Sequence, residues 1–299
     1  MNVPTNLFHG SGNITSIHQQ GFNPQLTGAG GHDQLGSGYY FTNTISDAND
    51  YMTRIRIDLP PGATKLGGHN APGVAFVNVQ LTKPIILSQV ENNIDNFEFD
   101  LTAEQIYQII KKCPRIFDLS QTPLVDHCDD VHDDGVKDRH LREVSRFYLG
   151  QPLSSLEVDF FNDKGESEIY RRAAFEATGF DGVVHDKGDG LVHVVAWFKE
   201  QVAFTPEHEL MYQVQQKLTE YKDDLDGDQL ARMVLKGVEC DTELKGRLFD
   251  AISDGGSLSK LNEITFNHVQ SVDRKIDIEP EVIPVLDNLN QARSMRPNR

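Results

Sequence analysis

The sequence predicts an α+β protein that ends in a helical annex. Residues 73–81, GVAFVNVQL, alternate in polarity and are rich in β-branched and aromatic side chains, as strands are. Two further apolar runs, at residues 182–186 and 191–198, are separated by KGDG, which is typical of a hairpin turn. After Pro206, three consecutive segments have helical periodicity and no run resembles a strand.

The N-terminal part predicts two short strands, each followed by a helix. The first strand is expected to end at Leu7 and Phe8, and the short helix after it ends at Gly21. A glycine-rich loop over residues 27–38 leads to the second strand, YYFT. Apolar residues at helical spacing follow, so we expect a helix whose cap is Thr44 or Ser46.

The central part contains two clear helices on either side of an irregular stretch. In LTAEQIYQIIKKCP, Thr102 and Gln105 have the spacing of a capping box, and Pro114 stops the helix. Residues 118–140 are acidic and irregular. The second helix, in GESEIYRRAAFEATGFDG, ends at Gly179.

These elements suggest two parts that meet near residue 206. Residues 1–206 carry every predicted strand and form one domain, with a helical and acidic insertion over about residues 90–165. Residues 207–299 form the helical annex, and residues 279–299 are expected to be a short helix with a frayed basic end.

The composition indicates a globular protein of a reducing compartment. The chain has 299 residues and a net charge of −17, so it repels phosphate backbones and is not expected to coat nucleic acid. A local basic pocket for a nucleotide or a short RNA stretch stays open. No secretory leader or membrane-spanning run is visible. The three scattered cysteines do not form a disulfide framework, so we expect a cytoplasmic protein.

Three separated motifs carry the functional prediction. They are FHGSG at residues 8–12, GYYFTNTISDANDY at residues 38–51, and GFDGVV at residues 179–184, which leads through two strands to EQV at residues 200–202. In this order they resemble the diphtheria-toxin-like and poly(ADP-ribose)-polymerase-like branch of the ADP-ribosyltransferase superfamily, which is named for a His-Tyr-Glu triad. The resemblance covers residues 6 to about 205.

The resemblance implies two small packed β-sheets around a cleft that binds NAD. There, His9 would hydrogen-bond the adenosine ribose, and the backbone of Gly10 would hold the nicotinamide carboxamide. Tyr40 and Tyr51 would sandwich the nicotinamide ring. Ser11 would lie at the mouth of the cleft, and Ala48 is the small residue of the family's A-x-x-Y pattern. The implied NAD-binding residues are therefore His9, Gly10, Ser11, Tyr40, Ala48 and Tyr51.

The glutamate of this branch is not found in its usual register. That position, seven residues before the Glu200–Gln201 pair, is His193, so the catalytic residues implied are His9, Tyr40 and His193. An imidazole stabilises a developing cation less well than a carboxylate does. Three interpretations stay open: His193 replaces the glutamate in an active transferase, a nearby carboxylate serves instead, or the domain binds NAD or a partner without catalysis. The carboxylates in question are Asp186, Asp189 and Glu200.

The resemblance implies a mono-ADP-ribosyltransferase. It would use NAD as a co-substrate and transfer one ADP-ribose to a macromolecular acceptor, either a protein side chain or a nucleic-acid base. Such a domain on an acidic chain is similar to a bacterial or phage-associated toxin or effector, and its annex could bind a neutralising partner protein. The alternatives are an inactive binding module with the same fold and an NAD glycohydrolase.

One acidic segment, residues 126–134, gathers potential metal ligands. His127, Cys128 and His132 lie among aspartates, and metal binding there competes with a solvated acidic loop, which we favour. ADP-ribosyl transfer of this kind needs no metal, so we expect no metal cofactor and no membrane partner.

Overall fold

The computed structural model describes residues 6–23, 38–58, 72–87, 101–112, 134–147 and 167–278, together with Pro4 and Leu35. Three features discussed above lie outside these residues. They are most of the glycine-rich loop 27–38, the segment 126–133 that contains the histidines and cysteine considered as metal ligands, and the C-terminal residues 279–299.

The described strands form one mixed sheet, which confirms the α+β class. Its order is β4-β5-β6-β2-β1-β3-β7, and the pairing of β4 with β5 is parallel whereas the others are antiparallel. The strands are β1 (Asn6–Ser11), β2 (Tyr39–Thr42), β3 (Gly73–Val79), β4 (Ile85–Leu87), β5 (Gly182–Gly188), β6 (Leu191–Ala196) and β7 (Val202–Phe204).

The expectation of two packed sheets is not met, because the seven described strands belong to one sheet. The middle of this sheet is weakly joined, however. Strand β1 pairs with β3 along its whole length, from Asn6 to Ser11, but with β2 only at Phe8 and Thr42. The sheet therefore consists of two halves, β4-β5-β6-β2 and β1-β3-β7, that meet at a single residue pair.

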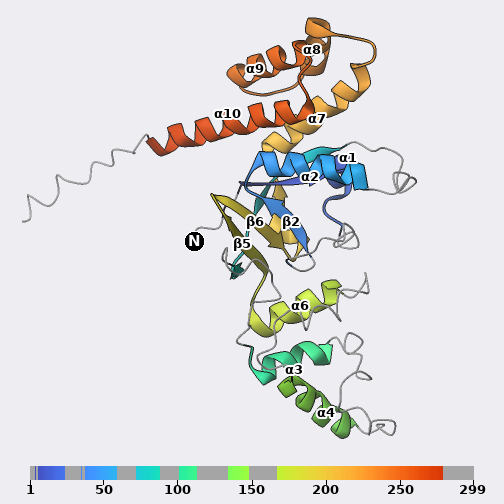
Figure 1. The fold of residues 1–299 in the computed structure, drawn as a ribbon, viewed down its shortest axis with the longest axis vertical. Coiled ribbons are helices and arrows are strands. Elements are labelled where there is room, and N and C mark those ends of the chain that lie inside the picture. Colours follow the sequence, from blue (N-terminus) through green and yellow to red (C-terminus); the bar gives the residue numbers. More distant parts are fainter. Residues whose placement is uncertain are drawn as a thin grey trace, which may run out of the picture.

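The helices lie in three tiers along the molecule (Figure 1). Helices α3, α4 and α6 lie at one end, α1 and α2 lie with the sheet, and α7 to α10 lie at the other end. Their bounds are α1 (Ile14–Gln20), α2 (Ile45–Asp58), α3 (Ala103–Lys112), α4 (Asp134–Phe147), α6 (Ser167–Thr178), α7 (Pro206–Tyr221), α8 (Gly227–Leu235), α9 (Thr242–Ser253) and α10 (Leu258–Ile278).

Side chains of the sheet alternate between two faces, which are covered differently. On one face, which we call the α1 face, Leu7 packs in a core that includes Ile14 of α1. On the opposite face, the α2 face, Phe8 packs with α2 and with the annex helices. A second core of the α2 face contains Val195 and side chains of α3 and α6. The α2 face of the sheet therefore carries two apolar cores.

Several local predictions are confirmed. Helix α1 ends at Gly21, whose φ is 74°. The capping box of α3 is present, because the N–H of Thr102 donates to Oε1 of Gln105 at 2.9 Å and the N–H of Gln105 donates to Oγ1 of Thr102 at 3.2 Å. Strands β5 and β6 form the expected hairpin, with Asp189 of its turn at a φ of 51°.

Other local predictions were wrong or incomplete. Strand β1 does not end at Phe8 but continues to Ser11, because β3 supplies backbone partners that outweigh the poor strand propensity of Gly10. Helix α4 begins at Asp134, inside the stretch expected to be irregular. The long helix α10 was not predicted, although Leu261 and Ile264 bury one of its sides in the core.

The annex packs directly against α2. Strand β7 ends at Phe204 and α7 begins at Pro206, so the change from strands to helices falls where the sequence places it. Between α10 and α2, the Asn262 side-chain amide donates to Oδ1 of Asn49 at 3.0 Å, and the Asn49 amide donates to the carbonyl of Ser259 at 3.4 Å. Helix α2 is thus fixed between the sheet and α10.

A stack of aromatic rings joins α7 to α1 and β7. The ring of His208 lies 4.1 Å from that of Phe204, and the ring of His18 lies 3.6 Å from that of Tyr212. Nδ1 of His18 and Nε2 of His208 are 3.3 Å apart, so one ring donates to the other. Burial and the neighbouring His18 lower the pKa of His208 to about 4.

We expect this stack to make the stability of the protein depend on pH. The folded-state pKa of His208, about 4, lies below the value of about 6.5 in an unfolded chain. Between these values the unfolded chain binds more protons, so the free energy of unfolding should fall by up to about 3 kcal/mol as the pH decreases from 6.5 to 4. Urea denaturation at several pH values measures this slope.

The control is His208→Phe, which keeps the stacking on Phe204 and removes the titrating group. Burial also lowers the pKa of His9 and of His185, so these residues contribute a slope of the same sign in both proteins. The contribution of His208 is the difference between the slopes of parent and variant. Equal slopes would contradict the prediction.

Candidate functional site

The first feature of the site is the gap between β1 and β2. If the pairing at Phe8 and Thr42 continued, Gly10 would lie opposite Tyr40, but the two strands diverge and this pair does not form. Instead the side chain of His9 crosses the gap, where Nδ1–H donates to the carbonyl oxygen of Tyr40 at 2.7 Å. Two of the three predicted triad residues are therefore joined directly, through a side chain and a backbone carbonyl.

The hydrogen bond of His9 determines which of its nitrogens is available. Burial lowers the pKa of His9, against the opposing effect of the Tyr40 carbonyl, so the ring is neutral at pH 7. Because Nδ1 carries the proton, Nε2 is an acceptor. A ligand hydroxyl, such as that of a ribose, is a suitable donor to this nitrogen. The ring itself lies on the α1 face, 5.3 Å from the ring of Phe22 and 5.9 Å from that of Phe41.

Gly10 is required by the packing of α2. A Cβ atom at this position would lie 2.1 Å from the carbonyl oxygen of Ala48, 2.8 Å from the backbone nitrogen of Met52 and 3.0 Å from Cβ of Tyr51. The glycine thus lets the helix backbone lie directly on β1. Its α2 face is covered, so only the edge of the strand, toward the gap, is left for a ligand.

His193 lies on the α2 face together with Tyr40. It pairs with Thr42 across β6 and β2, and Tyr40 pairs with Val195, so the two side chains occupy diagonal positions on one face. The hydroxyl of Tyr40 accepts a hydrogen bond from the N–H of Leu35 at 3.1 Å. His9 points to the opposite face, so the three predicted triad side chains do not all share one face of the sheet.

Helix α2 brings Tyr51 and Asp47 to His193. The ring of Tyr51 is 42% exposed and lies 6.3 Å from the ring of His193 at an interplanar angle of 65°. Oδ2 of Asp47 lies 2.9 Å from Nε2 of His193, and the two side chains are 24% and 11% exposed. A carboxylate, an imidazole and an accessible aromatic ring thus meet at the start of α2.

The start of α2 is fixed to β6 by Asn43. The Asn43 side-chain amide donates to the carbonyl of Gly190 at 2.8 Å, and its Oδ1 accepts from the N–H of Val192 at 2.8 Å. Asp47 lies in the first turn of the helix, where a negative charge stabilises the helix dipole. These contacts hold the carboxylate of Asp47 against His193.

His185 is a further polar side chain on this face. It pairs with His193 across β5 and β6 and is 1% exposed. Neither ring nitrogen has a hydrogen-bond partner within the described part of the chain. Burial, followed by the charge of Lys187, lowers its pKa, so the ring is neutral at pH 7. A buried polar group without a partner is costly, and a bound ligand would supply one.

The other predicted site residues have structural roles or lie elsewhere. Ser11 accepts the N–H of Asn13 through Oγ at 3.1 Å, in the turn before α1. Ala48 is 0% exposed in the core beneath β1, so it is not available to touch a cofactor. It is the small residue that the close approach of α2 to Gly10 needs.

The three proposed replacement carboxylates do not lie beside His193. Asp186 pairs with Val192 and points to the opposite face, where its Oδ1 accepts the N–H of Gly188 at 2.9 Å. Asp189 lies in the hairpin turn. Glu200 borders a separate surface pocket of about 270 Å³ with Phe22 and Phe204.

Asp47 and His185 were missed by the sequence analysis. The signal for Asp47 is its spacing from Tyr51, because residues four apart lie on the same side of a helix. His185 had no comparable signal, since its significance comes from its pairing with His193.

We expect Gly10→Ala to destabilise the protein, because the added methyl group meets helix backbone that cannot rotate away. The cost should be about 1–3 kcal/mol in the free energy of unfolding, measured by urea denaturation. Gly246→Ala is the control, since nothing lies within 4 Å of a Cβ there. Gly246 lies inside α9, so this change should stabilise by up to about 1 kcal/mol. A neutral Gly10→Ala would show that α2 is not held on β1.

None of the described helices is long and apolar enough to cross a membrane. Comparison with protein-family models, with curated proteins and with solved structures finds no match to this chain. The resemblance to ADP-ribosyltransferases therefore rests on the motifs of the sequence.

Proposed function

We propose that the chain is a mono-ADP-ribosyltransferase of the ADP-ribosyltransferase fold, with its NAD site in the gap between β1 and β2. The observation that carries the proposal is the meeting of three distant motifs. Gly10 lies against Tyr51, and the ring of Tyr51 lies 6.3 Å from that of His193. The hydrogen bond from His9 to the Tyr40 carbonyl adds the remaining triad members.

The site offers groups for each part of NAD. Tyr51 is an accessible aromatic ring on which a flat cationic nicotinamide can stack. The edge of β1 at Gly10 faces the gap and can exchange backbone hydrogen bonds with a carboxamide. Nε2 of His9 accepts a ribose hydroxyl.

The pair of Asp47 and His193 supplies what the missing glutamate would supply. In the reaction, the bond between ribose C1′ and the nicotinamide nitrogen breaks, and its electron pair stays on the nitrogen as neutral nicotinamide leaves. The Asp47 carboxylate stabilises the positive charge that develops on the ribose. The acceptor then forms a bond to C1′ and gives its proton to a base. Nε2 of His193 is hydrogen-bonded to Asp47, and Nδ1, the other ring nitrogen, takes this proton.

The roles of Asp47 and His193 can be tested by mutation. His193→Ala should lower turnover by about two orders of magnitude or more with little change in the affinity for NAD. Asp47→Asn should lower turnover at least about tenfold, because it removes the carboxylate but keeps the size of the side chain. Asp50→Asn, an equal change of charge at an exposed residue of the same helix, is the matched control. Equal activity of the two asparagine variants would exclude a role for Asp47.

Tyr51 is expected to bind NAD rather than to take part in proton transfer. Tyr51→Ala should weaken NAD binding several-fold, because stacking of one ring contributes about 0.5–1.5 kcal/mol. Tyr51→Phe keeps the ring and should bind as the parent does. Calorimetry with NAD measures both affinities, and unchanged binding by Tyr51→Ala would remove Tyr51 from the site.

Incubation of the purified chain with radiolabelled NAD and a whole-cell lysate tests the function itself. Label that is sensitive to protease indicates a protein acceptor, and label that is sensitive to nuclease indicates a nucleic-acid acceptor. Release of nicotinamide without label on either indicates an NAD glycohydrolase. Binding of NAD without turnover indicates an inactive module, and no binding at all overturns the proposal.

We place this activity in the cytoplasm, as that of a toxin or effector. The three scattered cysteines, which suit a reducing compartment, support this setting. The annex would then be the surface for a neutralising partner protein, because it packs on α2, which carries Asp47 and Tyr51.

A further inference from the structure

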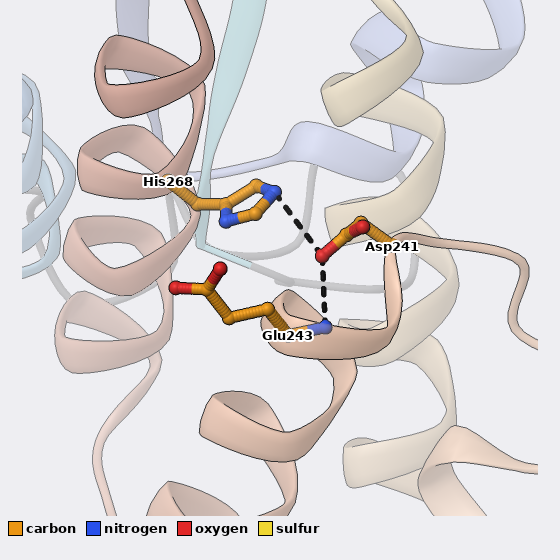
Figure 2. A group of neighbouring side chains, drawn as sticks. All are labelled: Asp241, Glu243 and His268. Carbon is orange, nitrogen blue, oxygen red and sulfur yellow. Dashed lines mark hydrogen bonds and ion pairs between the residues drawn. The ribbon is translucent and has the colours of Figure 1, made fainter. Parts of the chain in front are cut away.

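A second cluster of chemically active side chains lies in the annex, remote in sequence from the site above. Asp241 precedes α9, Glu243 lies in its first turn, and His268 comes from α10. Figure 2 shows the imidazole of His268 between the two carboxylate side chains, with one nitrogen directed toward Asp241. One donor atom from each residue can be chosen so that all lie within 4.8 Å of one another.

His268 is the observation that distinguishes this cluster from ordinary surface acids. Its residue is 8% exposed, and its Nδ1 is buried without a hydrogen-bond partner in the described chain. Its Nε2 lies 3.6 Å from Oδ1 of Asp241, longer than a good hydrogen bond. The imidazole is therefore buried with Nδ1 unpartnered and with Nε2 beyond hydrogen-bond distance of the carboxylate that it faces, so a bound ion can supply a partner that the protein does not.

Asp241 is prepared to be an anionic ligand. Its Oδ1 accepts the N–H of Glu243 at 2.8 Å and that of Leu244 at 3.2 Å, which fixes the carboxylate as the cap of α9. The same backbone hydrogen bonds lower the pKa of Asp241, so it is ionised at pH 7. Its second oxygen accepts neither of these bonds.

We propose that Asp241, Glu243 and His268 bind a divalent transition-metal ion of the Zn²⁺ class. One imidazole nitrogen and two carboxylate oxygens suit Zn²⁺, whereas Mg²⁺ and Ca²⁺ prefer a shell of oxygens alone. Bonds of about 2.0–2.2 Å in a tetrahedral site place neighbouring donors roughly 3.4 Å apart. Nε2 of His268 lies 3.6 Å from Oδ1 of Asp241, which is close to this spacing. The side chain of Glu243 is exposed and has room to move inward. Water fills the fourth position.

The bound ion would join the start of α9 to the middle of α10. Helix α10 also contacts α2 through Asn262 and Asn49. The ion would therefore stabilise the annex against the element that carries Tyr51 and Asp47. This inference does not depend on the proposed transferase activity, because it rests on residues of the annex alone.

Titration of the full chain with Zn²⁺ by calorimetry tests the proposal. The background is a variant with His127→Ala and His132→Ala, so that the acidic segment 126–134 does not contribute a site. We expect one equivalent of Zn²⁺ that Mg²⁺ does not displace. Glu243→Gln should weaken its binding at least about tenfold, and His268→Ala should remove it. Glu239→Gln, an exposed acid just before α9, should bind as the background does.

Spectroscopy with Co²⁺ identifies the ligands independently of stability. The visible absorption of Co²⁺ bound in a four-coordinate site should appear with the background protein and be lost in His268→Ala. If His268→Ala does not fold, Asp241→Asn and Glu243→Gln decide, because asparagine preserves the helix cap and Glu243 is exposed. No Zn²⁺ binding by the background at 100 µM metal, or equal binding by these variants, would overturn the proposal.

Discussion

The close approach of α2 to β1 at Gly10 is the constraint on which the site depends. No side chain other than hydrogen fits between Cα of Gly10 and the carbonyl oxygen of Ala48. Because the helix lies on the sheet at this distance, its first two turns reach the neighbouring strands β2 and β6. This places Asp47 at 2.9 Å from His193 and the ring of Tyr51 beside it. If a methyl group at residue 10 held α2 farther from β1, Asp47 and Tyr51 would move away from His193.

The site also depends on an incomplete sheet. Strands β1 and β2 share only the pair of Phe8 and Thr42, and the hydrogen bond from His9 to Tyr40 holds the diverging ends. Backbone groups of β1 beyond this pair face a gap instead of a strand. A continuous ladder would have been more stable and would have left no strand edge for a ligand inside the sheet. The two apolar cores of the α2 face stabilise the halves on each side of the gap.

Buried histidines are the common feature of the functional candidates. His193 is hydrogen-bonded to Asp47 through Nε2, whereas His185 and His268 have buried nitrogens without hydrogen-bond partners in the described residues. Leaving such a nitrogen unsatisfied costs about 1–3 kcal/mol, so a fold retains it only where something else is gained. In the annex, the proposed metal ion would be that gain for His268, and on the sheet His185 adds a polar side chain next to His193.

The sequence alone determined the local elements and the identity of most candidate residues. The capping box of α3, the hairpin of β5 and β6 and the first three helices after Pro206 all follow from neighbouring residues, because caps, turns and periodicity are short-range properties. The motifs likewise selected His9, Gly10, Tyr40, Tyr51 and His193, by type and order. Neither these short-range properties nor the motifs predict which face of a strand a side chain occupies once the strand pairs with distant residues.

Tertiary structure decided the rest. The pairing of β1 with β3 extended a strand through Gly10, and the register of β2 with β6 placed His193 beside Thr42. Packing of α2 made Asp47, and not a carboxylate near the hairpin, the partner of His193. Ala48 became core for the same reason. These outcomes depend on contacts between residues far apart in the sequence, such as Gly10 with Ala48, Ser11 with Gly73 and Thr42 with His193, which local propensity and spacing do not encode.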